Sequence, residues 1–211
     1  MKLEGIRRDI VKVCKDLYRN NLVRYTGTGG NVSVRDKNSG LIVVTPSQVR
    51  YDTMSPEELV VVTVDGEIVD KKKGREPTSE STTHRLIYDS FPDINAVIHT
   101  HSTYANVLAS VYSEIPAVHT EFAYFIGSKI PVTKWTNPGS QKMAEEVVKH
   151  LREYPATVLR NHGPITIGAD LKLALDRSLA VEDSSKIYYN ALSLGEPAVI
   201  SEKQTDQVKK G

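Results

Sequence analysis

Apolar residues recur along this chain with two periods, one typical of helices and one typical of strands. From Leu3 to Leu17 they return every three or four positions, which predicts an amphipathic helix that ends near Asn20. The same pattern, with its start and stop residues, predicts helices over 55–58, 79–91, 103–111 and 171–194, and another beginning at Asn137-Pro138. Short runs rich in Val and Ile predict strands at 31–35, 41–45, 60–64, 67–69, 96–98, 157–160 and 165–168.

The order of these elements indicates the fold class. Several strands follow one another in hairpin-like runs, and the pair Asp65-Gly66 is a strong signal for a tight hairpin turn. We therefore predict one α/β domain over residues 1–211, with a central, mostly antiparallel sheet flanked by helices on both faces. The segment from about residue 201 is polar and rich in lysine, and we expect it to be frayed.

Composition narrows the range of functions. A net charge of +1 provides no general attraction to nucleic acid or to an anionic membrane, so neither is an expected partner. No apolar run approaches the roughly 20 residues that cross a bilayer, and the charged amino terminus does not look like a secretion signal. The single cysteine, Cys14, excludes an internal disulfide and fits a cytoplasmic protein.

Four dispersed side chains have the chemistry of a metal site. His99 and His101 follow the apolar run 96–98, and residues two apart on a strand point to the same side. His162 lies at the turn after another predicted strand, and Glu80 supplies a carboxylate. Three imidazoles and a carboxylate suit Zn²⁺ or a similar divalent ion with a position left for substrate or water. The pattern predicts a metal-dependent enzyme.

Three short segments combine glycine with small hydroxyl residues at the ends of predicted elements: Gly27–Ser33, Thr45–Ser47 and Thr78–Ser79. Such segments offer backbone N–H groups and hydroxyls to a phosphate, and Ser79 would add a helix start. Each segment alone is more typical of an ordinary turn or cap. Together, and with Glu80 directly after Ser79, they indicate phosphate binding beside the metal.

These motifs resemble the class II aldolase/adducin family over residues 5 to 195. The family pattern is present as GTGGNVS at 27–33, TPS at 45–47, SE at 79–80, HTHS at 99–102 and NHG at 161–163. The resemblance implies a homotetramer with active sites between neighbouring subunits. It implies one divalent ion per subunit, Zn²⁺ or another such as Mn²⁺ or Co²⁺, on His99, His101 and His162. It also implies substrate phosphate at Gly30, Asn31, Thr45, Ser47 and Ser79, with Glu80 as a catalytic carboxylate that approaches the metal.

The resemblance also implies a reaction. A ketose 1-phosphate, such as L-fuculose 1-phosphate, would be cleaved to dihydroxyacetone phosphate and a short aldehyde such as lactaldehyde. The metal would act as a Lewis acid and stabilise the enediolate that forms when the C3–C4 bond breaks. Glu80 would shuttle the proton at the three-carbon fragment.

Departures from the family pattern keep other reactions open. Fuculose-phosphate aldolases carry a tyrosine where Thr120 stands, and Glu121, which follows it, could transfer the proton across the subunit interface. A glutamate in this segment is also a feature of the methylthioribulose-1-phosphate dehydratases. The L-ribulose-5-phosphate 4-epimerases have aspartate in place of Glu80 and an acid in place of Ala123, which favours aldol cleavage here. A non-catalytic scaffold like adducin would have eroded metal ligands, whereas all four are present.

His84 lies one helical turn after Glu80 on the same predicted helix face. It can be a partner of the site residues, although a packed or surface histidine is the simpler interpretation.

Overall fold

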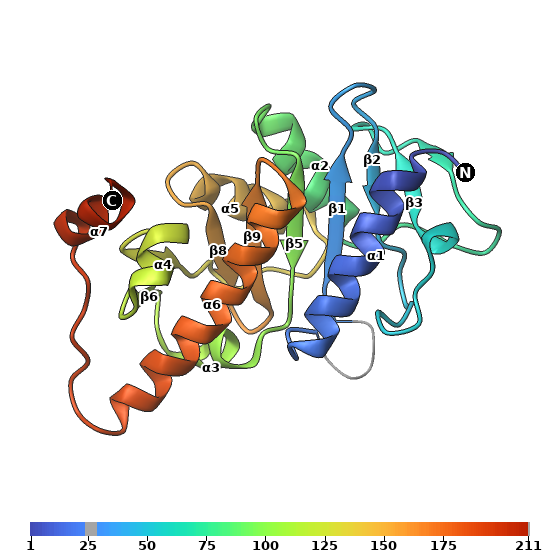
Figure 1. The fold of residues 1–211 in the computed structure, drawn as a ribbon. Coiled ribbons are helices and arrows are strands. Elements are labelled where there is room, and N and C mark those ends of the chain that lie inside the picture. Colours follow the sequence, from blue (N-terminus) through green and yellow to red (C-terminus); the bar gives the residue numbers. More distant parts are fainter. Residues whose placement is uncertain (24–28, 211) are drawn as a thin grey trace.

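A seven-stranded antiparallel sheet, with the strand order β4-β3-β2-β1-β5-β9-β8, forms the centre of the computed structural model (Figure 1). The structure describes residues 1–23 and 29–210. The strands of this sheet are β1 (Asn31–Arg35), β2 (Ile42–Val44), β3 (Val60–Val62), β4 (Ile68–Asp70), β5 (Ala96–His99), β8 (Ala156–Leu159) and β9 (Gly163–Gly168). Every pair of neighbours in it is antiparallel. The predicted fold class is confirmed.

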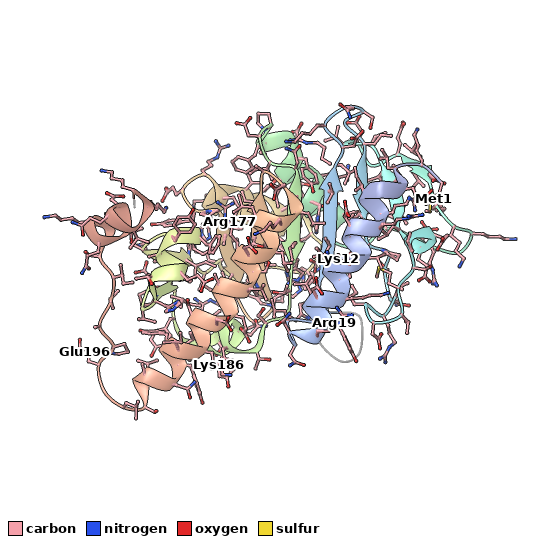
Figure 2. All side chains as sticks on the ribbon, in the orientation of Figure 1. Met1, Lys12, Arg19, Arg177, Lys186 and Glu196 are labelled. Atoms are coloured by element: carbon pink, nitrogen blue, oxygen red, sulfur yellow. The ribbon has the colours of Figure 1, made fainter. Side chains whose placement is uncertain are left out.

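Helices cover both faces of this sheet. Figure 1 shows α1 (Glu4–Arg19) and α6 (Leu171–Leu192) on one face, with α2 (Ser81–Ser90) and α5 (Gln141–Leu151) on the other. The exposed side of α1 carries Lys12 and Arg19, and that of α6 carries Lys186 (Figure 2). Within the two described ranges, no helix combines the length and apolar character that crossing a bilayer needs.

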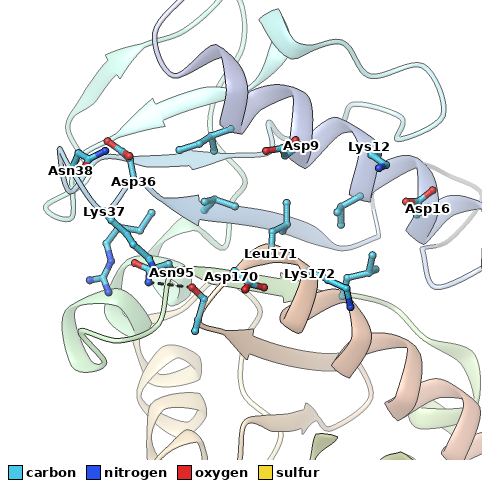
Figure 3. A pocket seen from close by; sticks show the side chains of 16 residues that line it. Asp9, Lys12, Asp16, Asp36, Lys37, Asn38, Asn95, Asp170, Leu171 and Lys172 are labelled. Atoms are coloured by element: carbon cyan, nitrogen blue, oxygen red, sulfur yellow. Dashed lines mark hydrogen bonds between the residues drawn. The ribbon is translucent and has the colours of Figure 1, made fainter.

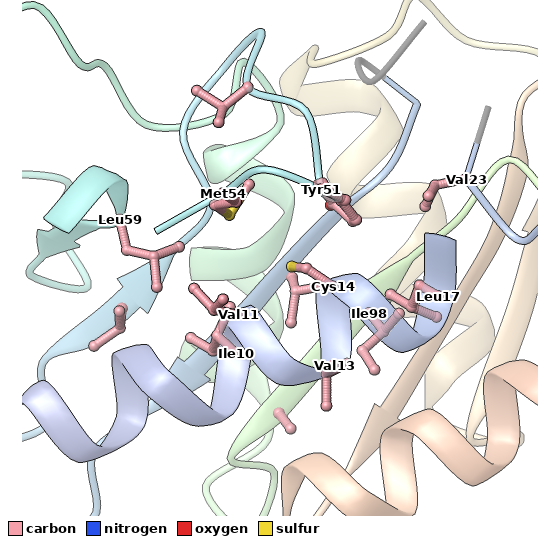
Figure 4. Packing of buried hydrophobic residues seen from close by; sticks show 14 of the residues in the cluster. Ile10, Val11, Val13, Cys14, Leu17, Val23, Tyr51, Met54, Leu59 and Ile98 are labelled. Atoms are coloured by element: carbon pink, nitrogen blue, oxygen red, sulfur yellow. The ribbon is translucent and has the colours of Figure 1, made fainter. Parts of the chain in front are cut away.

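Alternation along the strands supplies a separate apolar core to each face. Val43, Val61 and Ile98 pack under α1 with Ile10, Cys14 and Leu17 (Figure 4). Their neighbours in the chain face the other way, where Val44, Val60 and Val97 pack against α2 and α5. Because side chains on a strand alternate between faces, fully buried runs of Val and Ile fill both layers.

A third core lies beside the main sheet. It packs α3 (Thr103–Val111), α4 (Thr120–Phe125) and the two-stranded sheet of β6 (Glu114–Pro116) and β7 (Lys129–Pro131) against α6. The apolar pattern of the sequence predicted α3 but not α4. Six residues are too few to establish a helical period, although Phe122 and Ala123 are fully buried by it.

Two helices begin later than their sequence signals suggested. The helix expected to start at Ser79 begins at Ser81, and Glu80, not Ser79, occupies its N-cap position. The helix expected from Asn137-Pro138 begins at Gln141 after Ser140, whose hydroxyl accepts a hydrogen bond from the Met143 N–H at 3.2 Å. A serine side chain that accepts a hydrogen bond from a free N–H of the first turn caps the helix and fixes where it starts.

The polar tail differs from the expectation of fraying. Residues Glu202–Lys210 form α7, which packs on α4 (Figure 1). The Ile200 N–H donates to the Ala117 carbonyl at 2.7 Å, and Thr205 is only 4% exposed. One acidic residue in the first turn and two lysines in the last also suit the helix dipole.

Candidate active site

His99 occupies the last position of β5, a strand paired with β1 on one side and β9 on the other. The ring is fully buried, and its Nδ1 donates to the Pro164 carbonyl at 3.0 Å. A donating Nδ1 leaves Nε2 as an unprotonated lone pair. Burial lowers the pKa of His99 to about 4, and the Glu80 carboxylate only partly opposes this effect. The ring is therefore neutral at neutral pH, as a metal ligand must be.

The rings of His99, His101 and His162 meet at one point. Their centroids are 4.7–5.0 Å apart, and one nitrogen of each lies within 4.8 Å of the others. His101 lies beyond the end of β5, so the strand alternation that suggested this pair stops at His99. Hydrogen bonds hold the two other histidines: the His101 N–H donates to the Leu22 carbonyl, and the Asn106 side chain donates to the His162 carbonyl at 2.9 Å.

The Glu80 carboxylate completes the cluster from the start of α2. Its oxygens lie 3.5 Å from His99 Nε2 and 3.2 Å from His162 Nε2, and Asn31 Nδ2 donates to it at 3.1 Å. Burial alone would raise the pKa of Glu80, but the two histidines and the Asn31 amide outweigh it and hold this pKa well below its usual value. Glu80 is an ionised, largely buried carboxylate.

The arrangement of these groups fits a divalent cation. His99 Nε2 and His162 Nε2 are 3.3 Å apart, and both face the carboxylate. Around a tetrahedral Zn²⁺ with bonds of about 2.0–2.1 Å, ligand atoms are separated by roughly 3.3 Å. Converging lone pairs and a carboxylate repel one another unless a cation or proton lies among them. The donor set, nitrogen with one carboxylate, is one that zinc and similar ions accept.

Two glycines allow the backbones around the cluster to approach closely. A Cβ on Gly30 (φ +108°) would lie 2.6 Å from the His99 carbonyl oxygen, and one on Gly163 would lie 2.0 Å from the Thr100 carbonyl oxygen. Neither distance is possible for a real side chain. Glycine at these two positions brings the starts of β1 and β9 against the end of β5, where the histidines are.

The expected phosphate segments lie side by side. The Thr78 N–H donates to the Thr45 carbonyl, the Ser47 N–H donates to the Glu76 carbonyl, and Pro46 pairs with Pro77. A cavity of about 360 Å³ opens there, and its lining residues include Gly30, Ser47, Thr78 and Ser79. Since Ser79 precedes Glu80, this cavity adjoins the histidine cluster. Gly27 and Thr28 of the glycine-rich turn lie outside the described residues.

Two of the residues expected to bind phosphate have other partners in the structure. Thr45 is 1% exposed, and its hydroxyl accepts the Val32 N–H at 3.1 Å. Asn31 is 4% exposed, with its amide between Glu80 and His84. Among the described residues, Gly30, Ser47 and Ser79 line this cavity, whereas Asn31 and Thr45 do not. The pairing of β1 with β2 and with β5 sets the surroundings of these two side chains, and sequence alone does not reveal it.

A second cavity, of about 290 Å³, opens beside His101 and His162 and is also lined by Asn106 and Asn161. Asn106 was not expected from the sequence, although an asparagine one turn after HTHS on a helix was a usable signal. Glu182 of α6 was not expected either, and its carboxylate accepts the Tyr104 and Ala105 N–H groups at 3.0–3.1 Å. That contact fixes the start of α3, just after His101.

Glu121 and Ala123 lie on α4, away from these contacts. Glu121 is exposed, and Ala123 is fully buried. Among the described residues, no hydrogen bond or ion pair joins Glu121 to the histidine cluster, so a role at an active site would have to be at that of a neighbouring subunit.

A larger groove, of about 750 Å³, lies between α1 and the start of α6 (Figure 3). Its lining includes Asp9, Lys12, Asp36 and Lys172, and it contains none of the histidines. Its mixed charges offer no convergent set of metal or phosphate ligands.

Comparison with known proteins determines the family. Residues 8–189 match the class II aldolase and adducin N-terminal domain. The chain belongs to the class II aldolase and adducin family. Class II aldolases are metal-dependent, and the histidine triad of this chain can bind a metal. The family and its aldolase members are consistent with a lyase.

Similar class II family members are named for more than one reaction. A 5-deoxy-D-ribulose 1-phosphate aldolase of Bacillus thuringiensis is 33% identical, covering 100% of this chain and 96% of its own. An L-ribulose-5-phosphate 4-epimerase of Salmonella paratyphi C is 32% identical, covering 90% and 86%. A solved L-fuculose 1-phosphate aldolase is 31% identical, with a TM-score of 0.92 over 100% of this chain and 97% of its own. The class II aldolase fold and sugar-phosphate metabolism are thereby supported, and the substrate is left open.

Proposed function

We propose that this protein cleaves a ketose 1-phosphate to dihydroxyacetone phosphate and a short aldehyde, with a divalent cation held by His99, His101 and His162. The convergence of these imidazoles on the Glu80 carboxylate carries the proposal. The aldolase relatives support it, because one is named for 5-deoxy-D-ribulose 1-phosphate and others for L-fuculose phosphate.

The cation site needs three neutral imidazoles with correctly directed lone pairs. The Pro164 carbonyl fixes His99 with Nε2 toward the site, and Asn106 fixes the backbone of His162. Bound there, Zn²⁺ or a similar ion supplies Lewis-acid polarisation of the substrate carbonyl. Glu80 approaches the same point as a fourth group.

Glu80 is the proposed proton carrier. Its carboxylate is ionised and faces the place where the three imidazoles converge. As the C3–C4 bond breaks, the C4 hydroxyl loses a proton and C3 of the three-carbon fragment gains one. We propose Glu121 of a neighbouring subunit as the group that accepts the proton from C4. Glu80, which is ionised at rest, would take up a proton from water and transfer it to C3, and Glu121 would release its proton to water.

The substrate phosphate is assigned to the cavity beside Glu80. Ser47 and Ser79 offer hydroxyls there, and Gly30 allows close approach to the backbone. The Ser47 hydroxyl donates to the Pro77 carbonyl at 3.1 Å. To bind phosphate it would have to rotate and donate to a phosphate oxygen. Asn31 and Thr45 would act indirectly. Asn31 holds the Glu80 carboxylate, and Thr45 holds the start of β1 through the Val32 N–H.

The assembly is proposed to be a cytoplasmic homotetramer with active sites between subunits. Apolar side chains stay exposed on the adjacent helices α3 and α6, including Val111 at 71% and Ile187 at 42%. Exposed apolar groups in one region are typical of subunit interfaces. Such an interface would also provide the neighbour to which Glu121 is assigned.

The second candidate reaction is 4-epimerisation of L-ribulose 5-phosphate, which the 32% identical epimerase favours. Ala123 opposes it, because this position, where those epimerases carry an acid, is a fully buried alanine.

The deciding experiment measures dihydroxyacetone phosphate released from 5-deoxyribulose 1-phosphate, fuculose 1-phosphate and ribulose 5-phosphate. We expect release from a 1-phosphate, lost with a chelator and restored by added Zn²⁺. Conversion of ribulose 5-phosphate to its 4-epimer without release would replace the aldolase by an epimerase. Loss of water from methylthioribulose 1-phosphate would instead identify a dehydratase.

A further inference from the structure

A chain of hydrogen bonds runs through the buried interior behind Glu80. Tyr88 OH is 2.8 Å from Ser33 Oγ, which is 2.6 Å from His84 Nδ1. His84 Nε2 contacts Asn31 Oδ1, and Asn31 Nδ2 is 3.1 Å from Glu80 Oε2. The four residues behind the carboxylate are each at most 4% exposed. The chain therefore leads from a buried phenol to the edge of the site without a break.

The orientation of the Asn31 amide determines the direction of every hydrogen bond in this chain. Asn31 Nδ2 faces Glu80 and donates to its carboxylate. The Asn31 oxygen then faces His84, whose Nε2 must carry a proton. His84 Nδ1 is left as an acceptor for the Ser33 hydroxyl, and the Ser33 oxygen accepts from Tyr88. Only one histidine tautomer satisfies all four contacts.

The neutral state of His84 is consistent with one donor and one acceptor on the ring. Burial lowers the pKa of His84 to about 4, while the Glu80 charge partly opposes this. If His84 did not donate to the Asn31 oxygen, the Asn31 amide could rotate by 180° and place that oxygen against Glu80. Two acceptors would then face each other in a buried space, which is unfavourable.

We propose that His84 is a positioning residue that, as its Nε2–H tautomer, holds the Asn31 amide with its NH₂ toward Glu80 and so orients the carboxylate. The tautomer follows from the geometry alone, whereas its effect on turnover rests on the proposed function. The two parts are therefore tested separately.

The first test reads the tautomer directly. Nitrogen-15 NMR of the Zn²⁺-loaded protein distinguishes protonated from unprotonated ring nitrogens, and the signals absent from His84→Gln belong to His84. We expect Nε2 protonated and Nδ1 unprotonated. A protonated Nδ1 would overturn the proposal, whatever reaction the protein catalyses.

The second test compares two substitutions that preserve different halves of the ring. In His84→Gln the amide NH₂ can still donate to Asn31, whereas His84→Asn is too short to reach it. We expect kcat to fall about 10- to 100-fold in His84→Asn with little change in KM, and to be largely kept in His84→Gln. Equal kcat values in these two variants would remove the positioning role.

Controls separate positioning from folding and metal loss. His150→Asn changes a partly buried histidine that contacts Thr157 Oγ1 at 2.9 Å and lies outside this chain of hydrogen bonds, and it should leave kcat unchanged. Metal content and urea unfolding are measured for each variant. A fall in His84→Asn that is fully explained by lost zinc or by unfolding would also contradict the proposal.

Discussion

Glu80 is the residue on which the proposed chemistry depends most. Its carboxylate contacts two histidines and one amide, and these contacts keep it ionised despite burial. Glutamine has nearly the same shape but cannot carry a proton to the substrate. The role of this one side chain is therefore separable from the role of the cation.

In Glu80→Gln we expect kcat for the aldol cleavage to fall by about 10²–10⁴-fold, the usual contribution of a general acid–base group. Metal content, measured by elemental analysis, should remain near one ion per subunit because three imidazoles are left. The matched control is Glu76→Gln, which changes an exposed carboxylate paired with Lys71. Full activity in Glu80→Gln would exclude Glu80 as the proton carrier.

The lowered pKa of His84 predicts how the stability of the protein depends on pH. Its pKa is about 4 in the folded protein against 6.5 ordinarily, so the unfolded chain binds more protons between these values. The free energy of unfolding of the metal-free protein should fall as pH is lowered from about 6.5 to about 4. Urea unfolding at several pH values should give a shallower slope for His84→Gln. Parallel slopes would show that His84 does not contribute.

At the scale of elements, the ends of strands and helices build the site. The cluster draws on the ends of β5 and the β8–β9 turn and on the start of α2, while β1 contributes Asn31. The tight contact of Gly163 with the Thr100 backbone connects two of these ends. A change at one junction should therefore reach the histidines without touching them.

Gly163→Ala tests this connection. Its methyl group would meet the Thr100 carbonyl, so the β8–β9 turn must shift, at a cost of about 1–3 kcal/mol in unfolding free energy. The shift would move His162, and zinc affinity measured by competition with a chelating dye should fall. Gly5→Ala is the control, since nothing lies within 4 Å of the added group. Unchanged zinc affinity in Gly163→Ala would contradict the connection.

The helix α7 lies where the sequence suggested a frayed tail, and truncation tests whether this helix stabilises the fold. Ending the chain after Ile200 should lower the melting temperature, since α7 packs on α4 and buries Thr205. A shift of about 2–4 °C is expected for each kcal/mol lost at this chain length. Lys210→Ala, at an exposed position, should melt like the parent protein. An unchanged melting temperature after truncation would mean that α7 does not stabilise the fold.

The elements that could be predicted are those with a clear period or a strong boundary signal. The spacing of apolar residues from Leu3 to Leu17 sufficed for α1, and short runs of Val and Ile sufficed for the strands of the main sheet. α4 has too few residues for a period, and α7 is stabilised by contacts with α4. Likewise, the histidine cluster follows from its motifs, but the partners of Thr45 and His84 depend on strand register. Long-range packing supplies that information.

At the scale of the whole molecule, the exposed apolar side chains are the basis for the proposed homotetramer. Leu192, the last residue of α6, is 36% exposed, and Leu194, which follows the helix, is 90% exposed, in addition to the apolar residues on α3. Light scattering should give the mass of four 23.4 kDa chains, and Leu192→Glu with Ile187→Glu should give a smaller species. The control is Ile68→Glu, which changes a similarly exposed residue on β4, the edge strand farthest from β8 and β9. This variant should keep the mass of the parent protein. A parent protein that is monomeric would contradict the tetramer.

The position of β5 between β1 and β9 has a consequence for hydrogen exchange. The backbone amides of Val97 to His99 belong to a strand that is paired on both sides, so exposing them to solvent requires two ladders to open together. Such openings approach the free energy of global unfolding. The amides of Val97 to His99 should therefore be among the slowest in the protein to exchange with deuterium, even in the metal-free protein. Local opening of β5 would therefore contribute little to the binding or release of an ion at the histidine cluster.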